Sequence, residues 1–255
     1  MADVGRLRRI GLILGGCVVM IAGCGGDDDA ADSGTPPARA DGTAELKRAV
    51  DLMHRKGTAE FTLSFNSDNL PAGEDGVEAD GVGRVDFRRT RAQYVVRYHE
   101  APGVDAGTEL EFHSDGATTY ARPRGSGLYQ LQEPSLVANG PADSFKYIAT
   151  DTIGVHETGA KTVEGRRCTT YEGKLDFTRI RARAPASRRA EFDRTTRGVK
   201  TQDFNVCIDN GHVVREYGFD VRVPGGGDFV LRVVSRFTRV GNAEPVEALR
   251  ADEKE

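Results

Sequence analysis

Hydrophobic residues recur at helical spacing in one stretch of the chain, about residues 43–56. Gly57 follows the stretch and is typical of a helix end. Apolar residues at positions i, i+3, i+4 and i+7 lie on one side of a helix. The four that do so here are Leu46, Ala49, Val50 and Met53. The pattern therefore predicts an amphipathic helix with one buried side.

After Gly57 the spacing changes to strict alternation, the period of a half-buried strand. In the first such segment Phe61, Leu63 and Phe65 share one face, and polar residues share the other. Short polar turns separate about ten such segments, and Asn210-Gly211 predicts a type I′ hairpin turn. We expect strands at about 60–65, 83–87, 93–98, 109–112, 118–120, 153–162, 166–177, 201–209, 212–223 and 229–240, with 127–131 a candidate for one more short strand.

Two segments interrupt the alternation. In 134–150, Asp143 or Ser144 is a candidate cap for a short helix whose apolar side includes Phe145 and Ile148. In 179–198, seven arginines surround a helix predicted at about 186–195. Many strands, few helices and short connections predict an α+β fold built on one large antiparallel sheet.

Apolar side chains on the alternating faces have two interpretations. They form a closed core beneath the helices, or they line an apolar cavity; both use the same residue types, so pattern alone does not separate them. The candidate cavity residues are Phe61, Leu63, Phe65, Val85, Phe87, Val96, Leu110, Phe112, Phe219, Val221 and Leu231.

The N-terminus reads as a secretory signal peptide over 1–23. A head with three arginines precedes an apolar run over 10–23, which is too short to span about 30 Å of hydrocarbon. The run ends in Ile21-Ala22-Gly23-Cys24, which resembles the lipobox of bacterial lipoproteins. That resemblance implies cleavage before Cys24, a diacylglycerol on its sulfur and often a third acyl chain on its new amino group, with fatty acids such as palmitate in the anchor. We then expect a chain anchored to the outer, extracytoplasmic side of the cell membrane.

Between the anchor and the helix, residues 24–42 are polar and rich in Gly, Asp and Pro. Such a segment has nothing to bury, so we expect a flexible tether with a root-mean-square reach of roughly 25 Å. The folded domain then covers 43–244, and we expect the charged tail at 245–255 to be disordered. From Cys24 onward there are 32 Lys and Arg against 38 Asp and Glu, a net charge of −6. That balance argues against a nucleic-acid partner.

Cysteine counting isolates one pair. Cys17 leaves with the signal peptide and Cys24 is the acylation site, which leaves Cys168 and Cys207. An oxidising compartment favours a disulfide between them, and two separate buried thiols are the alternative. If strands 166–177 and 201–209 pair with the cysteines directly opposite, Leu175 faces Lys200.

No motif for catalysis or metal binding stands out. The five histidines have no ligand spacing, and Ser126 is a glycine-flanked serine without the surroundings of a nucleophile elbow. We expect no enzyme activity, no metal site and no cofactor. The arginines of 179–198 favour a solvated connection, and contact with anionic headgroups is the alternative.

The order of parts resembles the actinobacterial lipoproteins of the LprG and LppX family, which share a fold with the LolA lipoprotein carrier. The resemblance covers about 43–245 and adds four local patterns to the lipobox and the first helix. These are Ser114-Asp115-Gly116 leading to Tyr120, Leu128-Tyr129, Val163-Glu164-Gly165, and the hairpin Ile208-Asp209-Asn210-Gly211. Two features depart from it: Cys207 stands where relatives carry a large aromatic residue, and 179–198 is unusually basic.

The resemblance implies an unclosed, curved antiparallel sheet, a half-barrel, with helices covering an apolar cavity on its concave face. It also implies a lipid or glycolipid ligand that the protein carries or presents in the cell envelope. The alternative function is a structural or regulatory envelope lipoprotein with a filled core, acting through contacts with an envelope protein partner.

Overall fold

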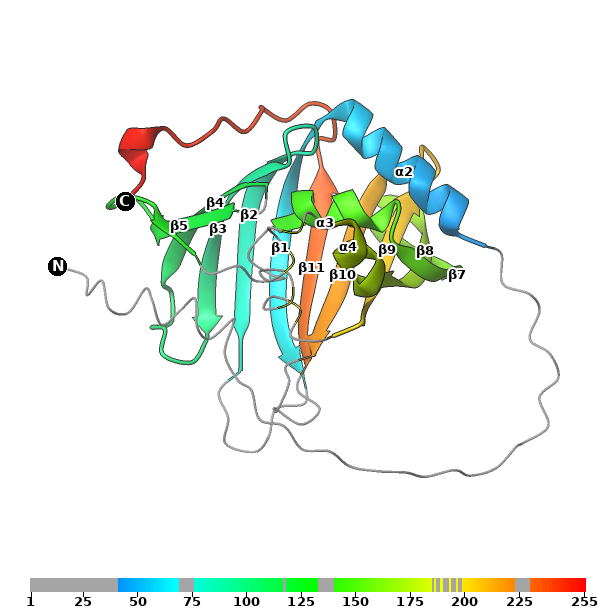
Figure 1. Cartoon of the computed structure of the whole chain (residues 1–255), viewed down its shortest axis with the longest axis horizontal. Helices are drawn as coiled ribbons and strands as arrows, with labels where there is room; N and C mark the ends of the chain where they lie inside the picture. Colours follow the sequence, from blue (N-terminus) through cyan, green and yellow to red (C-terminus); the bar gives the residue numbers. More distant parts are fainter. Residues whose placement is uncertain are drawn as a thin grey trace, which may run out of the picture.

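The computed structural model describes residues 41–68, 76–116, 118–132, 140–184, 199–222 and 230–255, together with 186, 189, 193 and 196. Its main element is one antiparallel sheet of eleven strands, which curves beneath three helices (Figure 1). The strands are β1 Thr58–Asp68, β2 Glu78–Asp86, β3 Arg91–Glu100, β4 Glu109–Asp115, β5 Thr118–Pro123, β6 Gln130–Leu131, β7 Thr152–Val163, β8 Arg166–Asp176, β9 Thr201–Asp209, β10 Val214–Arg222 and β11 Val230–Thr238. The predicted fold class, an α+β fold on a large unclosed sheet, is confirmed.

The sheet consists of two meanders that meet in its middle. Its order is β6-β5-β4-β3-β2-β1-β11-β10-β9-β8-β7, so the first and last strands of the chain pair centrally. β6 and β7 form the two edges, and α3 (Gly140–Ile148) lies in the long connection between them. Because every pair of adjacent strands in the sheet except β1–β11 is consecutive in the sequence, short-range signals were enough to indicate most of this topology.

The helices cover one face of the sheet. α2 (Thr43–Lys56) buries its four predicted apolar residues and ends at Gly57, whose φ of 88° is costly for any residue with a Cβ. α3 buries Phe145 and Ile148, as predicted. α4 (Phe177–Arg183) begins where a strand was predicted to end. The carboxylate of Asp176 accepts hydrogen bonds from the backbone N–H of Thr178 and Arg179, which caps the new helix.

Two local expectations about how neighbouring strands pair and turn are wrong in detail. Cys168 and Cys207 form a disulfide with a Cα–Cα distance of 5.5 Å, but they are not directly opposite. Cys168 faces Asp209 and Thr170 faces Cys207, so the pairing is shifted by two residues and the bridge is diagonal. Residues 210–211 do not form a type I′ turn, because only His212 has positive φ in that loop. Asp209 holds the turn by accepting hydrogen bonds from the N–H of Gly211 and Val213.

The C-terminal segment is ordered, and the prediction of a disordered tail at 245–255 is wrong. Val246 is fully buried, and Glu244 pairs with Arg84 at 2.5 Å. Tyr129 donates its N–H to Glu253 at 2.8 Å and accepts a hydrogen bond from Glu255 at 3.0 Å. One buried apolar side chain and backbone pairing beside edge strand β6 offset the entropy that a charged composition predicted the tail would keep.

The signal peptide (1–23), Cys24 and nearly all of the tether (24–42) lie outside the described residues. Within the described part of the chain, no helix has the length and apolar character needed to cross a membrane.

Candidate functional site

The candidate cavity residues come together on the helix-covered face of the sheet. Ten are buried, and Val221 is partly buried against them. They belong to one continuous apolar cluster that also contains the inward residues of α2, α3 and α4. The sequence therefore identified a shared face correctly, although these side chains come from six strands and one turn separated by up to 170 residues.

Glycines shape the middle of this apolar face. Phe61 of β1 faces Gly83 of β2, which in turn faces Tyr94 of β3. A Cβ on Gly83 would lie 2.4 Å from the carbonyl oxygen of Gln93 and 2.4 Å from the Cβ of Tyr94. With no side chain on β2 at this position, the rings of Phe61 and Tyr94 approach to 5.9 Å across it. Alternation alone did not single out this glycine.

One end of the face is closed by aromatic packing. We call it the capped end; it contains the strand termini at Thr58, Asp86 and Thr238. Phe145 of α3 packs against Phe87 at 5.1 Å and Phe237 at 5.3 Å between ring centroids. Such pairs add about 0.5–1.5 kcal/mol each beyond area burial. This end is a packed core fastened by a helix.

The opposite end carries the same residue types with less covering. We call it the loop end; it contains the strand termini at Asp68 and Val230, which face each other. Here Phe65, Phe219 and Leu231 project from β1, β10 and β11. Phe65 and Phe219 are each 7% exposed, whereas Phe87, Phe145 and Phe237 at the capped end are exposed by 1% or less.

Buried phenols supply the polar groups on this face. Burial raises the pKa of Tyr98 to about 12. Burial also raises the pKa values of Tyr94 and Tyr217, and Tyr217 shares a hydrogen bond with Ser144 of α3. All three hydroxyls stay protonated at neutral pH, so the face is uncharged. It is suited to apolar contacts with a few neutral hydrogen bonds rather than to acid–base chemistry.

The outer face of β3–β5 holds a polar cluster that sequence reasoning missed. Glu111 accepts hydrogen bonds from Gln93 at 3.1 Å and Arg122 at 3.0 Å, and the Arg122 guanidinium lies 4.2 Å from the centroid of the Tyr129 ring. Burial would raise the pKa of Glu111, but its hydrogen bonds, including one from Tyr129, lower it. The C-terminal segment completes this cluster, and no spacing in the sequence signals that long-range contact.

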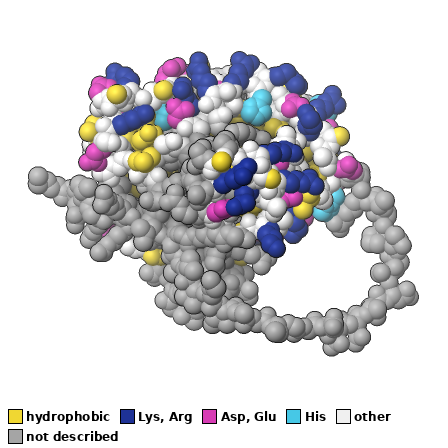
Figure 2. All heavy atoms as spheres, viewed as in Figure 1, with side chains coloured by type: hydrophobic (Ala, Val, Ile, Leu, Met, Phe, Trp, Pro, Cys, Tyr) yellow, Lys and Arg dark blue, Asp and Glu magenta, His cyan; other side chains and the backbone are white. Residues whose placement is uncertain are grey.

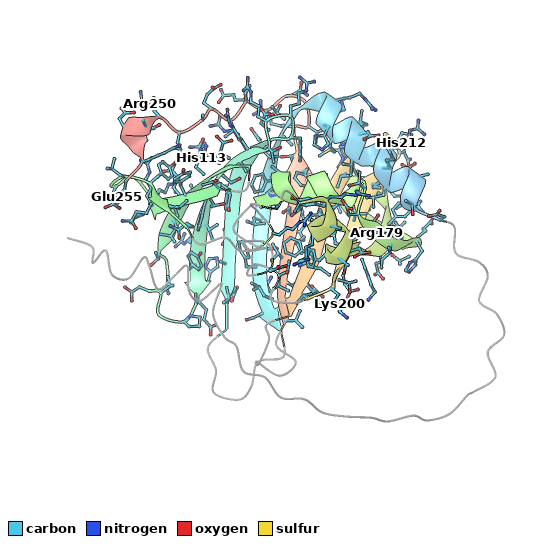
Figure 3. The ribbon with its side chains drawn as sticks, viewed as in Figure 1. His113, Arg179, Lys200, His212, Arg250 and Glu255 are labelled. Atoms are coloured by element: carbon cyan, nitrogen blue, oxygen red, sulfur yellow. A yellow bond between two sulfur atoms is a disulfide. The ribbon has the colours of Figure 1, made fainter. Side chains whose placement is uncertain are left out.

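His113 lies beside that cluster and is labelled in Figure 3. It is 3% exposed, its ring meets that of Tyr129 edge-on at 6.3 Å, and its Nε2 has no hydrogen-bond partner among the described atoms. Burial lowers its pKa. Across the described residues, no group of three His, Cys, Asp or Glu side chains is arranged to hold a metal ion.

Comparison with known proteins gives matches at the level of structure. No family model matches the chain, and no curated protein matches its sequence. The chain is similar to the lipoprotein LppX of Mycobacterium tuberculosis, with 12% identity, 80% of this chain and 97% of that chain covered, and a TM-score of 0.45. It is also similar to LprF of Mycobacterium bovis, with 13% identity, 81% of this chain and 95% of that chain covered, and a TM-score of 0.47. A LolA superfamily protein of Nitrosomonas europaea matches with 10% identity, 78% of this chain and 92% of that chain covered, and a TM-score of 0.31.

Proposed function

We propose that this chain is a lipoprotein, anchored to the membrane through Cys24, that binds the acyl chains of a lipid or glycolipid and carries or presents them in the cell envelope. The observation that carries the proposal is the uncharged apolar face, packed at one end and less covered at the other. Each methylene removed from water contributes about 0.8 kcal/mol, so a site that shelters an acyl chain offsets its extraction from a bilayer.

The loop end is the proposed place of binding. Phe65, Tyr98, Leu110, Phe219 and Leu231 surround it, with Val221 partly buried beside them. The capped end is already filled by Phe145 and its neighbours, so an acyl chain has no comparable place there.

The first experiment asks whether lipid accompanies the protein. The chain carrying Cys24→Ser, which has no acylation site, is purified from a bacterial host, extracted with organic solvent and analysed by mass spectrometry. We expect a stoichiometric acyl lipid and uptake of a fluorescent fatty acid. A protein that contains no lipid and takes up no fatty acid would contradict the proposal and favour the structural or regulatory alternative.

A matched pair of substitutions separates a ligand site from a filled core. Ala79 lies between Phe65 and Tyr98 at the loop end, whereas Ala59 lies at the capped end. We expect Ala79→Phe to occupy the ligand's space, so that fatty-acid uptake falls while stability is kept. Ala59→Phe overpacks a filled region and should lower the free energy of unfolding by about 1–3 kcal/mol. Equal destabilisation by both would show that the loop end is filled as well.

The anchor has its own test. The intact mass of protein recovered from bacterial membranes should show loss of residues 1–23 and addition of acyl chains. Cys24→Ser should prevent both changes. Recovery of the full-length, unmodified chain from a host that processes other lipoproteins would contradict the anchoring at Cys24.

A further inference from the structure

Five basic side chains gather around α4, and we call them the basic surface: Arg179, Arg181, Arg183, Arg189 and Lys200. Figure 2 shows Lys and Arg side chains concentrated over this part of the molecule, and Figure 3 labels Arg179 and Lys200 on it. The backbone N–H of Phe177 donates to the carbonyl of Lys200 at 2.9 Å, which fixes Lys200 beside the start of the helix.

The carboxylates that accompany these residues lie mostly beneath them. Arg183 pairs with Asp151 at 2.8 Å; the arginine side chain is 61% exposed and the aspartate 3%. Arg179 pairs with Asp176 at 3.2 Å; the arginine side chain is 54% exposed and the aspartate side chain 18%. The guanidinium groups of Arg179 and Arg183 therefore face solvent above more buried carboxylates, whereas Arg181 pairs with Asp193, whose side chain is 47% exposed. An outward guanidinium keeps N–H donors available for a phosphate.

The basic surface also interrupts an acidic molecule. Residues 174–203 contain nine Lys and Arg against four Asp and Glu, a net charge of +5. The chain from Cys24 onward has −6, so its remaining residues have −11, of which the tether over 24–42 contributes −4 and the rest of the domain −7. A domain with this distribution is repelled by an anionic surface on most sides and attracted on one, which orients it.

The tether enters the domain at the same edge of the sheet. Asp41 bridges to His156 of β7, and the N–H of Gly42 donates to Val155 at 3.0 Å. Asp151, the partner of Arg183, immediately precedes β7. Five residues of strand span about 16 Å, so the entry of the tether and the basic surface lie close enough to face one membrane together.

The basic surface lies at the loop end of the apolar face. α4 follows Asp176, which faces Thr201 at the start of β9. Two strands further into the sheet, Arg222 faces Val230, and Val230 in turn faces Asp68. The strand termini beside the basic surface therefore belong to the end where acyl-chain binding is proposed.

We propose that the basic surface around α4 docks the tethered domain on the anionic headgroups of a phospholipid bilayer, with the loop end of its apolar face turned toward the membrane. This inference rests on the proposed anchoring at Cys24. The anchor holds the domain within reach, and the basic surface selects the side that makes contact. A lipid can then pass directly between the membrane and the loop end, because its acyl chains do not have to move around the domain.

The test uses the acylated chain reconstituted in vesicles of phosphatidylcholine, with or without 30% phosphatidylglycerol. An environment-sensitive fluorophore on Ala182→Cys reports contact at α4, and one on Val82→Cys, 60% exposed on β2, is the control position. We expect the α4 label to shift its emission only on phosphatidylglycerol vesicles. The shift should disappear at 0.5 M salt, where the screening length is about 4 Å. The Val82 label should not change.

Charge reversal gives the decisive comparison. Arg179→Glu with Arg181→Glu should lower the docked-to-undocked ratio at least about 25-fold, at roughly fivefold for each arginine removed. Arg124→Glu with Arg232→Glu changes the net charge equally outside the basic surface and should leave docking nearly unchanged. Arg189→Glu with Lys200→Glu is a second pair that breaks no carboxylate pair of the described structure, and near-UV circular dichroism confirms its folding.

Failure of docking and failure of anchoring give different results. If Cys24 is not acylated, vesicles of phosphatidylcholine alone do not retain the protein. If it is acylated but the basic surface does not dock, both compositions retain the protein and the α4 label emits identically on each. Equal loss of the shift in the Arg124/Arg232 control would also overturn the proposal, because net charge rather than this surface would then explain the binding.

Discussion

The capped end and the loop end of the same apolar face differ in what holds them. At the capped end, Phe145 brings the rings of Phe87, Phe237 and Tyr217 together, and all four side chains are essentially fully buried. At the loop end the same strands present Phe65 and Phe219 with more exposure and without that helix. The alternation of apolar residues is equally regular at both ends, so the covering element, not the strand pattern, makes the difference.

Further structural connections gather near the capped end. The Cys168–Cys207 disulfide joins β8 to β9 on the outer face of the sheet, in a small cluster with Val163. The C-terminal segment crosses to β6 and buries Val246 (Figure 1). A molecule fastened at one end can let the other end open without unfolding, which is what the proposed lipid binding would require. Four predictions test this division.

The largest expected effect comes from removing the ring at the centre of the capped end. Phe145→Ala should lower the free energy of unfolding by about 3–5 kcal/mol, because it leaves a cavity among rigid neighbours. Phe219→Ala at the loop end should lower the free energy of unfolding clearly less, and it should reduce fatty-acid uptake instead. Urea denaturation of both variants checks this. Equal costs would remove the distinction between the two ends.

Removing the disulfide should have the next largest effect. Cys168→Ser with Cys207→Ser releases a loop with a sequence separation of 39 residues, which corresponds to about 4 kcal/mol of chain entropy. The bridge lies on the face away from the apolar cluster, so fatty-acid uptake by the folded variant should be unchanged. Thermal unfolding and a binding titration measure the two quantities. A variant as stable as the parent would mean that the bridge does not constrain the unfolded chain.

Replacing glycines of β2 by alanine should lower the free energy of unfolding by a smaller amount, which differs between the two positions. Gly83→Ala places its Cβ 2.4 Å from the Gln93 carbonyl, whereas Gly81→Ala places it 2.8 Å from the Val95 carbonyl. We expect a loss of about 1–3 kcal/mol for the first and less for the second, because the strands must separate to admit either methyl group. Val82→Ala, an exposed neighbour, is the control and should be nearly neutral. Reversal of the order would show that β2 and β3 are less tightly paired near the capped end.

The smallest effect concerns pH. Burial lowers the pKa of His113, so the unfolded chain binds a proton more readily than the folded one. Stability from this residue is full above the unfolded pKa of about 6.5 and is lost as pH falls through the folded value. Asp115, Arg91, Lys254 and Glu253 surround it and modulate the shift.

The measurement is the free energy of unfolding from pH 7.5 to 5, together with hydrogen exchange of residues 246–255. In the parent, acid should weaken stability and the protection of the C-terminal segment. His113→Gln should flatten this pH dependence. An unchanged slope in the variant would assign the acid sensitivity to other groups.

Local signals explain what could be predicted. The α2 stripe, the strand alternation and the hairpin turns depend on neighbouring residues, so the large antiparallel sheet and the shared apolar face were accessible from sequence. The cysteine pair was also correct, because only two cysteines remained. Its register was wrong by two residues, since alternation is unchanged by a shift of two and does not distinguish a direct from a diagonal pair.

The sequence by itself determined which residues face inward, which segments are strands, and where the basic charge is concentrated. Tertiary structure alone decided that Phe145 closes one end of the face, that residues 245–255 are ordered, and that the basic surface lies beside both the tether entry and the loop end. The physical reason is distance along the chain. Periodicity records contacts between near neighbours, whereas these features join residues tens of positions apart or more, whose meeting depends on how the whole sheet assembles.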